Sequence, residues 1–188
     1  MFKPKTEWVV VEQEKIPAME IFFKYLLPLT VFAMVMAFLD YGIIGHWDSS
    51  LSSKIIYGSI YAVIYGATII GSVLLSSVLI DVFAKVFGFE KNPNRSFTIV
   101  VYAFTPICIG TIFFIIPFMT WLYYLVCLYG CACVFFGHFF TLVSDVKGKR
   151  LGYASVGAGV FYAVYWTLYV ILKISLTATI LSSLYYSL

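Results

Sequence analysis

A stretch of 47 residues from Phe97 to Val143 contains no Asp, Glu, Lys or Arg. As one α-helix it would be about 70 Å long, more than twice the roughly 30 Å thickness of a bilayer's hydrocarbon core. The stretch must therefore cross a membrane twice, and Pro117 marks the natural corner between the two crossings. No other feature limits the fold so strongly.

The composition of the whole chain agrees with this interpretation. Of its 188 residues 62% are hydrophobic and 11% are charged, whereas a soluble domain is about half apolar and a quarter charged. A soluble globule and a disordered chain are excluded. A nucleic-acid-binding protein is excluded too, because the net charge is only +3 and no basic stripe exists. We expect an all-α integral membrane protein, a bundle of five transmembrane helices.

Polar segments divide the chain into these five spans. The predicted spans cover about residues 22–44, 54–80, 96–116, 118–143 and 152–175 of a membrane domain that comprises residues 21–188. The second span is open to continuation as far as Phe87. Residues 152–188 exceed one crossing, so this last helix either tilts or kinks, or its end after Lys173 lies along the outer surface.

Residues 1–20 are expected to form a short amphipathic segment at the cytoplasmic interface, with Trp8 as its anchor. A solvated tail is the alternative, because Pro17 interrupts the helical periodicity. Charged residues throughout this segment argue against a cleavable leader, so the first span is expected to act as an uncleaved insertion signal.

Basic residues predict the orientation, because cytoplasmic loops of membrane proteins are rich in Lys and Arg. In a five-span chain the N-terminal arm, the second loop and the fourth loop lie on one side of the membrane. That side has ten basic residues: Lys3, Lys5, Lys15, Lys24, Lys85, Lys91, Arg95, Lys147, Lys149 and Arg150. The opposite side has only Lys54, with Lys173 near its level. The N-terminus is therefore predicted to be cytoplasmic and the C-terminus to lie outside.

Four ionisable residues in or beside the spans are candidate functional groups, because such groups are costly in a membrane. Asp40 and Lys173 lie at a similar depth near the outer surface. They either form a pair or reach the headgroups separately, and we favour the second arrangement. Asp81 and His138 lie near the cytoplasmic ends of the second and fourth spans. A proton relay and a metal site are the two roles open to this pair, but a single His and a single Asp make a poor set of ligands.

Small residues recur at every fourth position in two spans. Gly58, Ala62 and Gly66 form one such set in the second span, and Ser155, Gly159 and Ala163 form another in the fifth. This spacing lets helix backbones approach closely, either within the chain or across a homodimer.

Signatures of catalysis are absent from the sequence. It contains no HExxH, GxSxG or GxxxxGK[ST] motif, and the four cysteines lie in apolar stretches without zinc or redox spacing. We expect a protein that is not an enzyme and that needs no cofactor or metal.

The sequence resembles the YIP family of five-span membrane proteins, in its prokaryotic branch. The resemblance covers essentially the whole chain. Its N-terminal part consists of Lys3-Pro4-Lys5-Thr6-Glu7-Trp8, Glu14 and Lys24-Tyr25-Leu26-Leu27-Pro28-Leu29. The more specific part consists of Asn92, Arg95, Tyr102-Ala103-Phe104-Thr105-Pro106 and Ile116-Pro117, followed by Leu128-Tyr129-Gly130, Gly137, Lys149 and Gly152-Tyr153.

This resemblance implies five spans with a cytoplasmic N-terminus, here in the cytoplasmic membrane of a bacterium, and it singles out Pro28, Tyr102, Pro106 and Pro117. Pro106 is expected to kink its helix and free a carbonyl near Tyr102, or merely to set the path of the helix, which we favour. The binding of Rab-type GTPases is not transferred, because the long N-terminal region and the Asp-Leu-Tyr-Gly-Pro segment of the eukaryotic branch are missing.

The expected activity is contact with membrane lipids or with other membrane proteins. The candidate contacts to anionic lipid are Lys91, Arg95, Lys147, Lys149 and Arg150, although topology alone would also explain these basic loops. A small dimeric channel or transporter, with Asp40, Asp81, His138 and Lys173 along a path, is the alternative. A lipid-handling protein is a third hypothesis.

Overall fold

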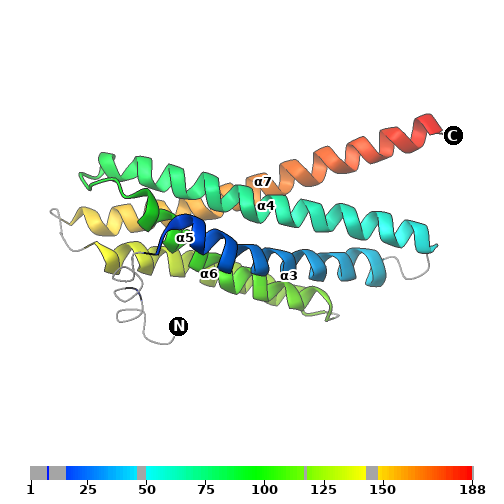
Figure 1. The fold of residues 1–188 in the computed structure, drawn as a ribbon, viewed down its shortest axis with the longest axis horizontal. Coiled ribbons are helices and arrows are strands. Elements are labelled where there is room, and N and C mark those ends of the chain that lie inside the picture. The colour runs from blue at the N-terminus through cyan, green and yellow to red at the C-terminus, as the bar shows by residue number, and fades with distance from the viewer. Residues whose placement is uncertain (1–7, 9–15, 46–49, 117, 143–147, 188) are drawn as a thin grey trace.

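The computed structural model describes residue 8 and residues 16–45, 50–116, 118–142 and 148–187. Every regular element in these ranges is a helix. Five helical segments are long and apolar enough to cross a membrane: Ala18–Ile44, Leu51–Val86, Pro93–Phe114, Thr120–Thr141 and Lys149–Leu176. They form an elongated bundle (Figure 1). The predicted five-helix, all-α fold is confirmed, while Pro117 itself lies outside the described residues.

The first span is a continuous helix with two wide turns. It consists of α2 (Ala18–Ile21), the π-helical η1 (Phe22–Leu26), α3 (Leu27–Phe38) and the π-helical η2 (Leu39–Ile44). The turn of η1 lies directly before Pro28, which has no N–H to donate to the carbonyl one turn earlier. In η2 the amide of Gly45 donates to the carbonyl of Asp40 over 2.7 Å, which closes a wide turn around Asp40.

The second span, α4 (Leu51–Val86), has 36 residues and is about 54 Å long. It begins at Ser50, whose Oγ accepts a hydrogen bond from the amide of Ser53. It ends where Gly88 takes a positive φ of 82° and the amide of Phe89 donates back to the carbonyl of Ala84. The helix thus continues past residue 80 and ends at Val86, close to Phe87, the longer of the two predicted ends.

The third and fourth spans form the hairpin predicted from the long uncharged stretch. The side chain of Asn92 caps α5 (Pro93–Gly110) by accepting from the amide of Arg95 over 3.0 Å. This helix passes through Pro106 and tightens into η3 (Thr111–Phe114), after which the chain turns back into α6 (Thr120–Thr141). Six consecutive residues, Ser96–Val101, are all buried, so α5 is an interior helix of the bundle.

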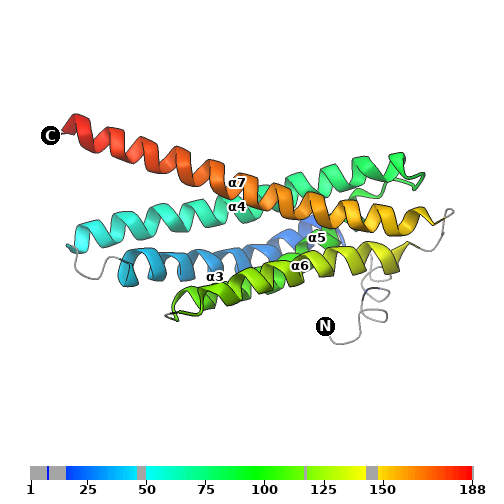
Figure 2. The ribbon, with the colours of Figure 1, turned by 180° about the vertical axis from the view of Figure 1, so that it is seen from behind.

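The fifth span belongs to α7 (Lys149–Ser187), a helix of 39 residues and about 58 Å. It crosses α4 and then diverges from the other helices toward the C-terminus, as both views show (Figures 1 and 2). The backbone therefore continues as one helix past Lys173.

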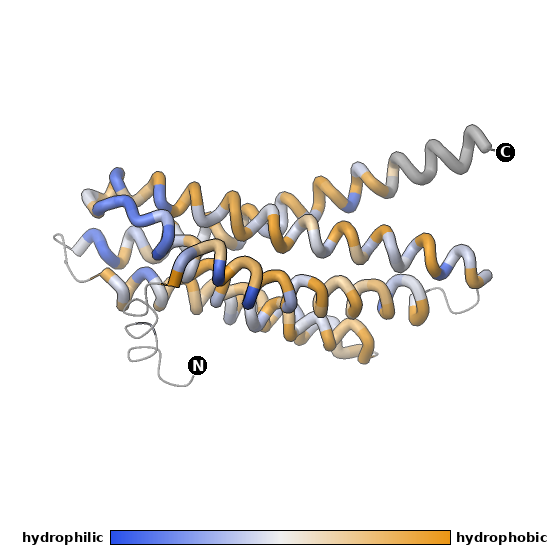
Figure 3. The backbone as a smooth tube through the Cα atoms, in the orientation of Figure 1, coloured by the Kyte–Doolittle hydropathy of each residue, from blue (hydrophilic) through white to orange (hydrophobic). Residues whose placement is uncertain are grey.

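Hydrophilic residues gather at one end of the bundle (Figure 3). The end of α4, the start of α5 and the start of α7 meet there. We call it the basic end, after its described residues Lys85, Lys91, Arg95, Lys149 and Arg150.

The two sets of small residues differ in their surroundings. A Cβ atom added to Gly58 would lie 2.8 Å from the ring of Phe38, and one added to Gly66 would lie 2.7 Å from Met34, so the set in α4 faces the first span. Ala62 is half-buried on the same helix. In α7, Ser155, Gly159 and Ala163 are exposed, and an added Cβ at Gly159 meets nothing within 4 Å. Only the first set packs helices within the chain.

The structure corrects the prediction that Trp8 is an interfacial anchor. Its side chain is 2% exposed, its ring meets Tyr102 edge to face at 6.5 Å, and it lies beside Gly137. The indole is therefore held by α5 and α6 rather than presented to headgroups. The remainder of residues 1–15, including Lys3, Lys5 and Lys15, lies outside the described part of the chain.

Candidate functional site

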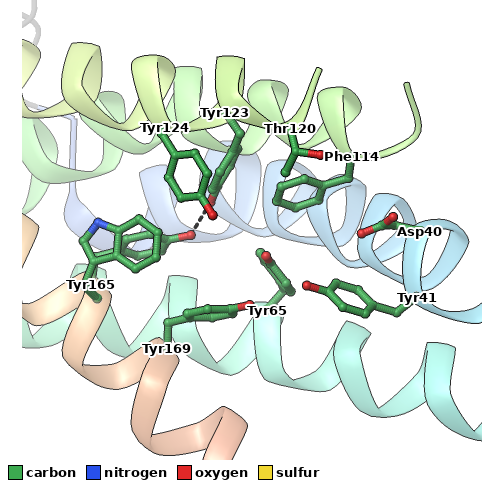
Figure 4. A pocket seen from close by; sticks show the side chains of 10 residues that line it. Asp40, Tyr41, Tyr65, Phe114, Thr120, Tyr123, Tyr124, Tyr165 and Tyr169 are labelled. Carbon is green, nitrogen blue, oxygen red and sulfur yellow. Dashed lines mark hydrogen bonds between the residues drawn. The ribbon is translucent and has the colours of Figure 1, made fainter. Parts of the chain in front are cut away.

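A small cavity lined by tyrosines lies near the end of the bundle opposite the basic end (Figure 4). Its volume is about 70 Å³, enough for a few water molecules. Its ten lining residues come from all five spans: Asp40, Tyr41, Tyr65, Phe114, Thr120, Tyr123, Tyr124, Tyr165, Trp166 and Tyr169. We call it the tyrosine cavity.

The tyrosine hydroxyls converge inside this cavity. Tyr123 and Tyr165, both buried, share a hydrogen bond between their hydroxyl groups (Figure 4). The ring of Tyr65 lies 5.5 Å from that of Phe114 and 5.4 Å from that of Tyr169. The wall thus combines apolar rings with hydroxyl groups that can donate and accept hydrogen bonds.

Asp40 and Lys173 lie around the same end of the bundle. Asp40 lines the cavity from the wide turn of η2. The ammonium of Lys173 lies 5.6 Å from the ring of Tyr169, a second lining residue, and 6.0 Å from the ring of Tyr61. Tyr61 stacks on Tyr41 at 3.6 Å, so aromatic rings connect the two predicted residues.

A second group of polar side chains lies in the interior near the basic end. It consists of Asp81 on α4, Arg95 and Ser96 on α5, His138 on α6 and Tyr153 on α7, and we call it the His138 cluster. The rings of His138 and Tyr153 meet edge to face at 5.1 Å. The hydroxyl of Tyr153 donates to the carbonyl of Ile80 over 3.2 Å. Arg95 and Asp81 lie in the neighbourhood of this hydroxyl.

The polar atoms of the His138 cluster are only partly paired. The carboxylate of Asp81 accepts a hydrogen bond of 2.7 Å from the amide of Asn92. Both ring nitrogens of His138, the Nε of Arg95 and the Oγ of Ser96 are buried and have no hydrogen-bond partner within the described chain. Buried polar groups are normally paired, so these atoms require water or another ligand.

An apolar groove opens between α5 and α6. Its volume is about 440 Å³, and its nine lining residues are Pro106, Ile109, Gly110, Ile112, Phe113, Leu122, Leu125, Val126 and Tyr129. Tyr129 carries a hydroxyl group, and the other eight residues are wholly apolar. At its base the helices touch, because a Cβ added to Gly110 would come within 2.9 Å of Val126. We call it the α5–α6 groove.

The motif residues of the third span have structural partners. Tyr102 lies between Trp8 and Tyr25, whose ring is 4.9 Å away. The hydroxyl of Tyr25 is hydrogen-bonded to Thr105 over 2.9 Å, one residue before Pro106. Tyr102 therefore joins the first span to α5, while Pro106 lines the groove.

The candidate lipid-binding cations divide into two kinds. Lys91 and Lys149 are exposed. Arg150 instead donates from Nε to the carbonyl of Phe139 and lies 4.5 Å above the Phe139 ring, while Arg95 turns its Nε inward. Lys147 lies outside the described residues.

The described residues include no cluster of side chains that could bind a metal ion. Within the described ranges, no group of three or more His, Cys, Asp or Glu side chains could hold a metal ion. Asp81 and His138 share Tyr153 as a neighbour, but they come without a third ligand.

The tyrosine cavity and the α5–α6 groove were not predicted from the sequence. The pairs Tyr61–Tyr65 and Tyr165–Tyr169 repeat at a spacing of four residues, which places each pair on one face of a helix. That repeat was a usable signal for the cavity.

Comparisons with protein-family profiles, curated proteins and solved structures found no match to this chain.

Proposed function

We propose that the chain is a non-enzymatic, five-span protein of YIP type in the bacterial cytoplasmic membrane, and that it acts through contacts with lipid. The sequence resemblance and the five apolar helices support the type. The excess of basic residues at one end of the bundle supports a cytoplasmic N-terminus and an outer C-terminus.

The α5–α6 groove is the observation that carries the proposal of lipid contact. Its volume falls within the range of about 300–1,000 Å³ typical of small-molecule sites. Ile109, Ile112 and Leu125 line it and remain half exposed at its rim. A groove with this lining offers dispersion contacts and almost no hydrogen bonds, which suits the acyl chain of a lipid.

The position of the groove adds to this argument. It lies on the two helices that form the uncharged hairpin, within segments expected to be surrounded by hydrocarbon. Lipid tails are always present there at high concentration, whereas a partner protein would have to compete with them. We therefore propose an acyl chain as the occupant of the groove.

Exposed cations at the basic end provide a second kind of lipid contact. Lys91 and Lys149 would lie against anionic headgroups, and each contributes about 1 kcal/mol when close to the membrane surface. Arg150 is bonded to the carbonyl of Phe139 and the Nε of Arg95 is buried, so their share in headgroup binding is smaller.

Photo-crosslinking tests the proposed groove. The purified protein is placed in vesicles that contain a phospholipid with a photoactivatable group on its acyl chain, and the labelled peptides are identified by mass spectrometry. We expect labels to concentrate on the peptides that carry residues 106–113 and 122–129.

Two variants of equal bulk make this experiment specific. Ile112→Trp places an indole into the groove and should remove most of the labelling there. Val78→Trp places the same indole on an exposed position of α4, outside the groove, and should leave the labelling unchanged. Labels spread evenly over all exposed faces, or unaffected by Ile112→Trp, would refute acyl-chain binding in the groove.

A further inference from the structure

A row of buried hydroxyl groups connects the region of the tyrosine cavity with that of the His138 cluster. Thr68, Ser72 and Ser76 follow one another at intervals of four residues along α4, and each is 0% exposed. At a rise of 1.5 Å per residue, successive hydroxyls lie about 6 Å apart along one face of the helix. Tyr65 of the cavity precedes the row by three residues, and Ile80, whose carbonyl binds Tyr153, follows it by four.

These three hydroxyls differ from others in the spans. Hydroxyls in transmembrane helices commonly donate to a backbone carbonyl about one turn earlier. Six do so over 2.6–2.9 Å among the described residues: Thr30, Ser77, Thr98, Thr111, Thr141 and Ser155. The hydroxyls of Thr68, Ser72 and Ser76 have no hydrogen-bond partner within the described chain.

His138 supplies an independent polar group at the end of this row. It is 0% exposed, and neither ring nitrogen has a partner in the described structure. Its Cδ2 would lie 3.4 Å from a Cβ placed on Gly157, and the same Cβ would lie 3.8 Å from Ile80. The imidazole therefore lies near the level of Ile80, which is one helical turn along α4 from Ser76, and Tyr153 and Arg95 lie close to it.

From these observations we propose that the α4 hydroxyl row, with water between its members, forms a proton path between the His138 cluster and the tyrosine cavity. Successive hydroxyls about 6 Å apart are too far for a direct hydrogen bond, and two hydrogen bonds of about 2.8 Å span that gap, so the proposed relay needs one water molecule between each pair. From Tyr65 to Asp81 the path extends about 24 Å along α4, most of the thickness of the hydrocarbon core.

The chemistry of the row selects a proton rather than a larger ion. Hydroxyl, imidazole and phenol groups each accept a proton on one lone pair and release another to the next acceptor. Only O–H and N–H bonds form and break, and each group regains its original protonation once it has reoriented. Neither a carboxylate nor an ammonium group belongs to the row, and the cavity at its end has room for only a few water molecules. The path lies within one copy of the chain and is independent of acyl-chain binding.

Proton entry into vesicles tests this proposal. The purified protein is reconstituted into vesicles of phosphatidylethanolamine and phosphatidylglycerol that contain a pH-sensitive dye, and valinomycin with a potassium gradient sets the membrane potential. We expect proton entry well above that of protein-free vesicles. Ser72→Ala should lower the protein-dependent rate about tenfold or more, because one missing link interrupts a relay. Ser72→Thr, which keeps a hydroxyl, should restore most of it.

Matched variants separate a path from a leak or a folding defect. Ser155→Ala removes an exposed hydroxyl that is bonded to Leu151, and it should leave the rate unchanged. Thr68→Val and His138→Phe should lower the rate as Ser72→Ala does, with unchanged helicity and elution volume. No proton entry by folded wild-type protein, or equal rates in wild type and these three variants, would overturn the proposal.

Discussion

The carboxylate of Asp81 accepts a hydrogen bond of 2.7 Å from the backbone amide of Asn92, the residue that caps α5. This contact joins the end of α4 to the start of the next span across a turn of few residues. Asp81 is only 6% exposed, and this amide satisfies one of its buried carboxylate oxygens. The buried Asp81 therefore has a structural role, which is to hold the end of α4 to the start of α5.

Removal of the Asp81 carboxylate should therefore loosen this turn. We expect Asp81→Ala to lower the free energy of unfolding by about 1–3 kcal/mol, because the amide of Asn92 loses its acceptor. Asp81→Asn keeps an acceptor oxygen and should cost less. Limited proteolysis by trypsin at Lys91 measures the effect, with Glu90→Ala, at an exposed position in the same turn, as the control. Equal cleavage of Asp81→Ala and wild type would contradict the assigned role.

A second prediction concerns the close contact between the first span and α4. A Cβ added to Gly42 would lie 2.7 Å from the carbonyl oxygen of Lys54 and 2.9 Å from the Cα of Gly58. These are backbone atoms that cannot rotate away, so Gly42→Ala should destabilise the protein by about 1–3 kcal/mol.

Gly159→Ala is the matched control for that variant. An added Cβ at this position in α7 meets nothing within 4 Å, so the change should be neutral or stabilise the helix by up to about 1 kcal/mol. Thermal unfolding in detergent, followed by circular dichroism, compares the two variants. A similar loss of stability in both would mean that Gly42 marks no special contact.

The hydrogen bond between Tyr123 and Tyr165 predicts coupled mutations. Tyr123→Phe leaves the buried hydroxyl of Tyr165 without this partner and should cost about 1–3 kcal/mol. When both residues are changed to Phe, no orphaned hydroxyl of the pair remains, so the double variant should lose less stability than the sum of the single variants. Additive losses in a double-mutant cycle would show that the two hydroxyls do not interact.

Trp8 offers a test of burial against interfacial anchoring. Loss of a packed indole typically costs about 3–5 kcal/mol, and we expect Trp8→Ala to fall in this range. Trp121 is 58% exposed, and Trp121→Ala should change the free energy of unfolding by less than about 0.5 kcal/mol. If the two substitutions had equally small effects, Trp8 would not belong to the core.

The number and order of the helices could be read from the sequence because bilayer thickness alone limits how an uncharged stretch of 47 residues can fold. The end of α4 was harder to place, because the residues after Ile80 continue the helix to Val86, and the positive φ that follows its end is at Gly88. The packing role of Gly58 and Gly66 was one of two predicted alternatives, and only the position of Phe38 and Met34 distinguishes them.

The interior sites were less accessible to sequence reasoning. Asp81 and His138 were predicted as candidate functional residues because they are ionisable groups in the spans. The unpaired hydroxyls of Thr68 and Ser72 are not marked by any pattern in the sequence. Whether a hydroxyl bonds to its own helix or faces the interior depends on the neighbouring helices. The tyrosine cavity likewise requires side chains from five separate segments to meet.

The arrangement of the two termini across the membrane tests the central claim most directly. Fluorescent-protein and alkaline-phosphatase fusions at each terminus, in bacterial cells, report the cytoplasmic and the outer side respectively. An odd number of crossings, with the basic end inside, predicts a fluorescent N-terminal fusion and an active phosphatase at the C-terminus. Both termini in the same compartment would contradict the five-span account.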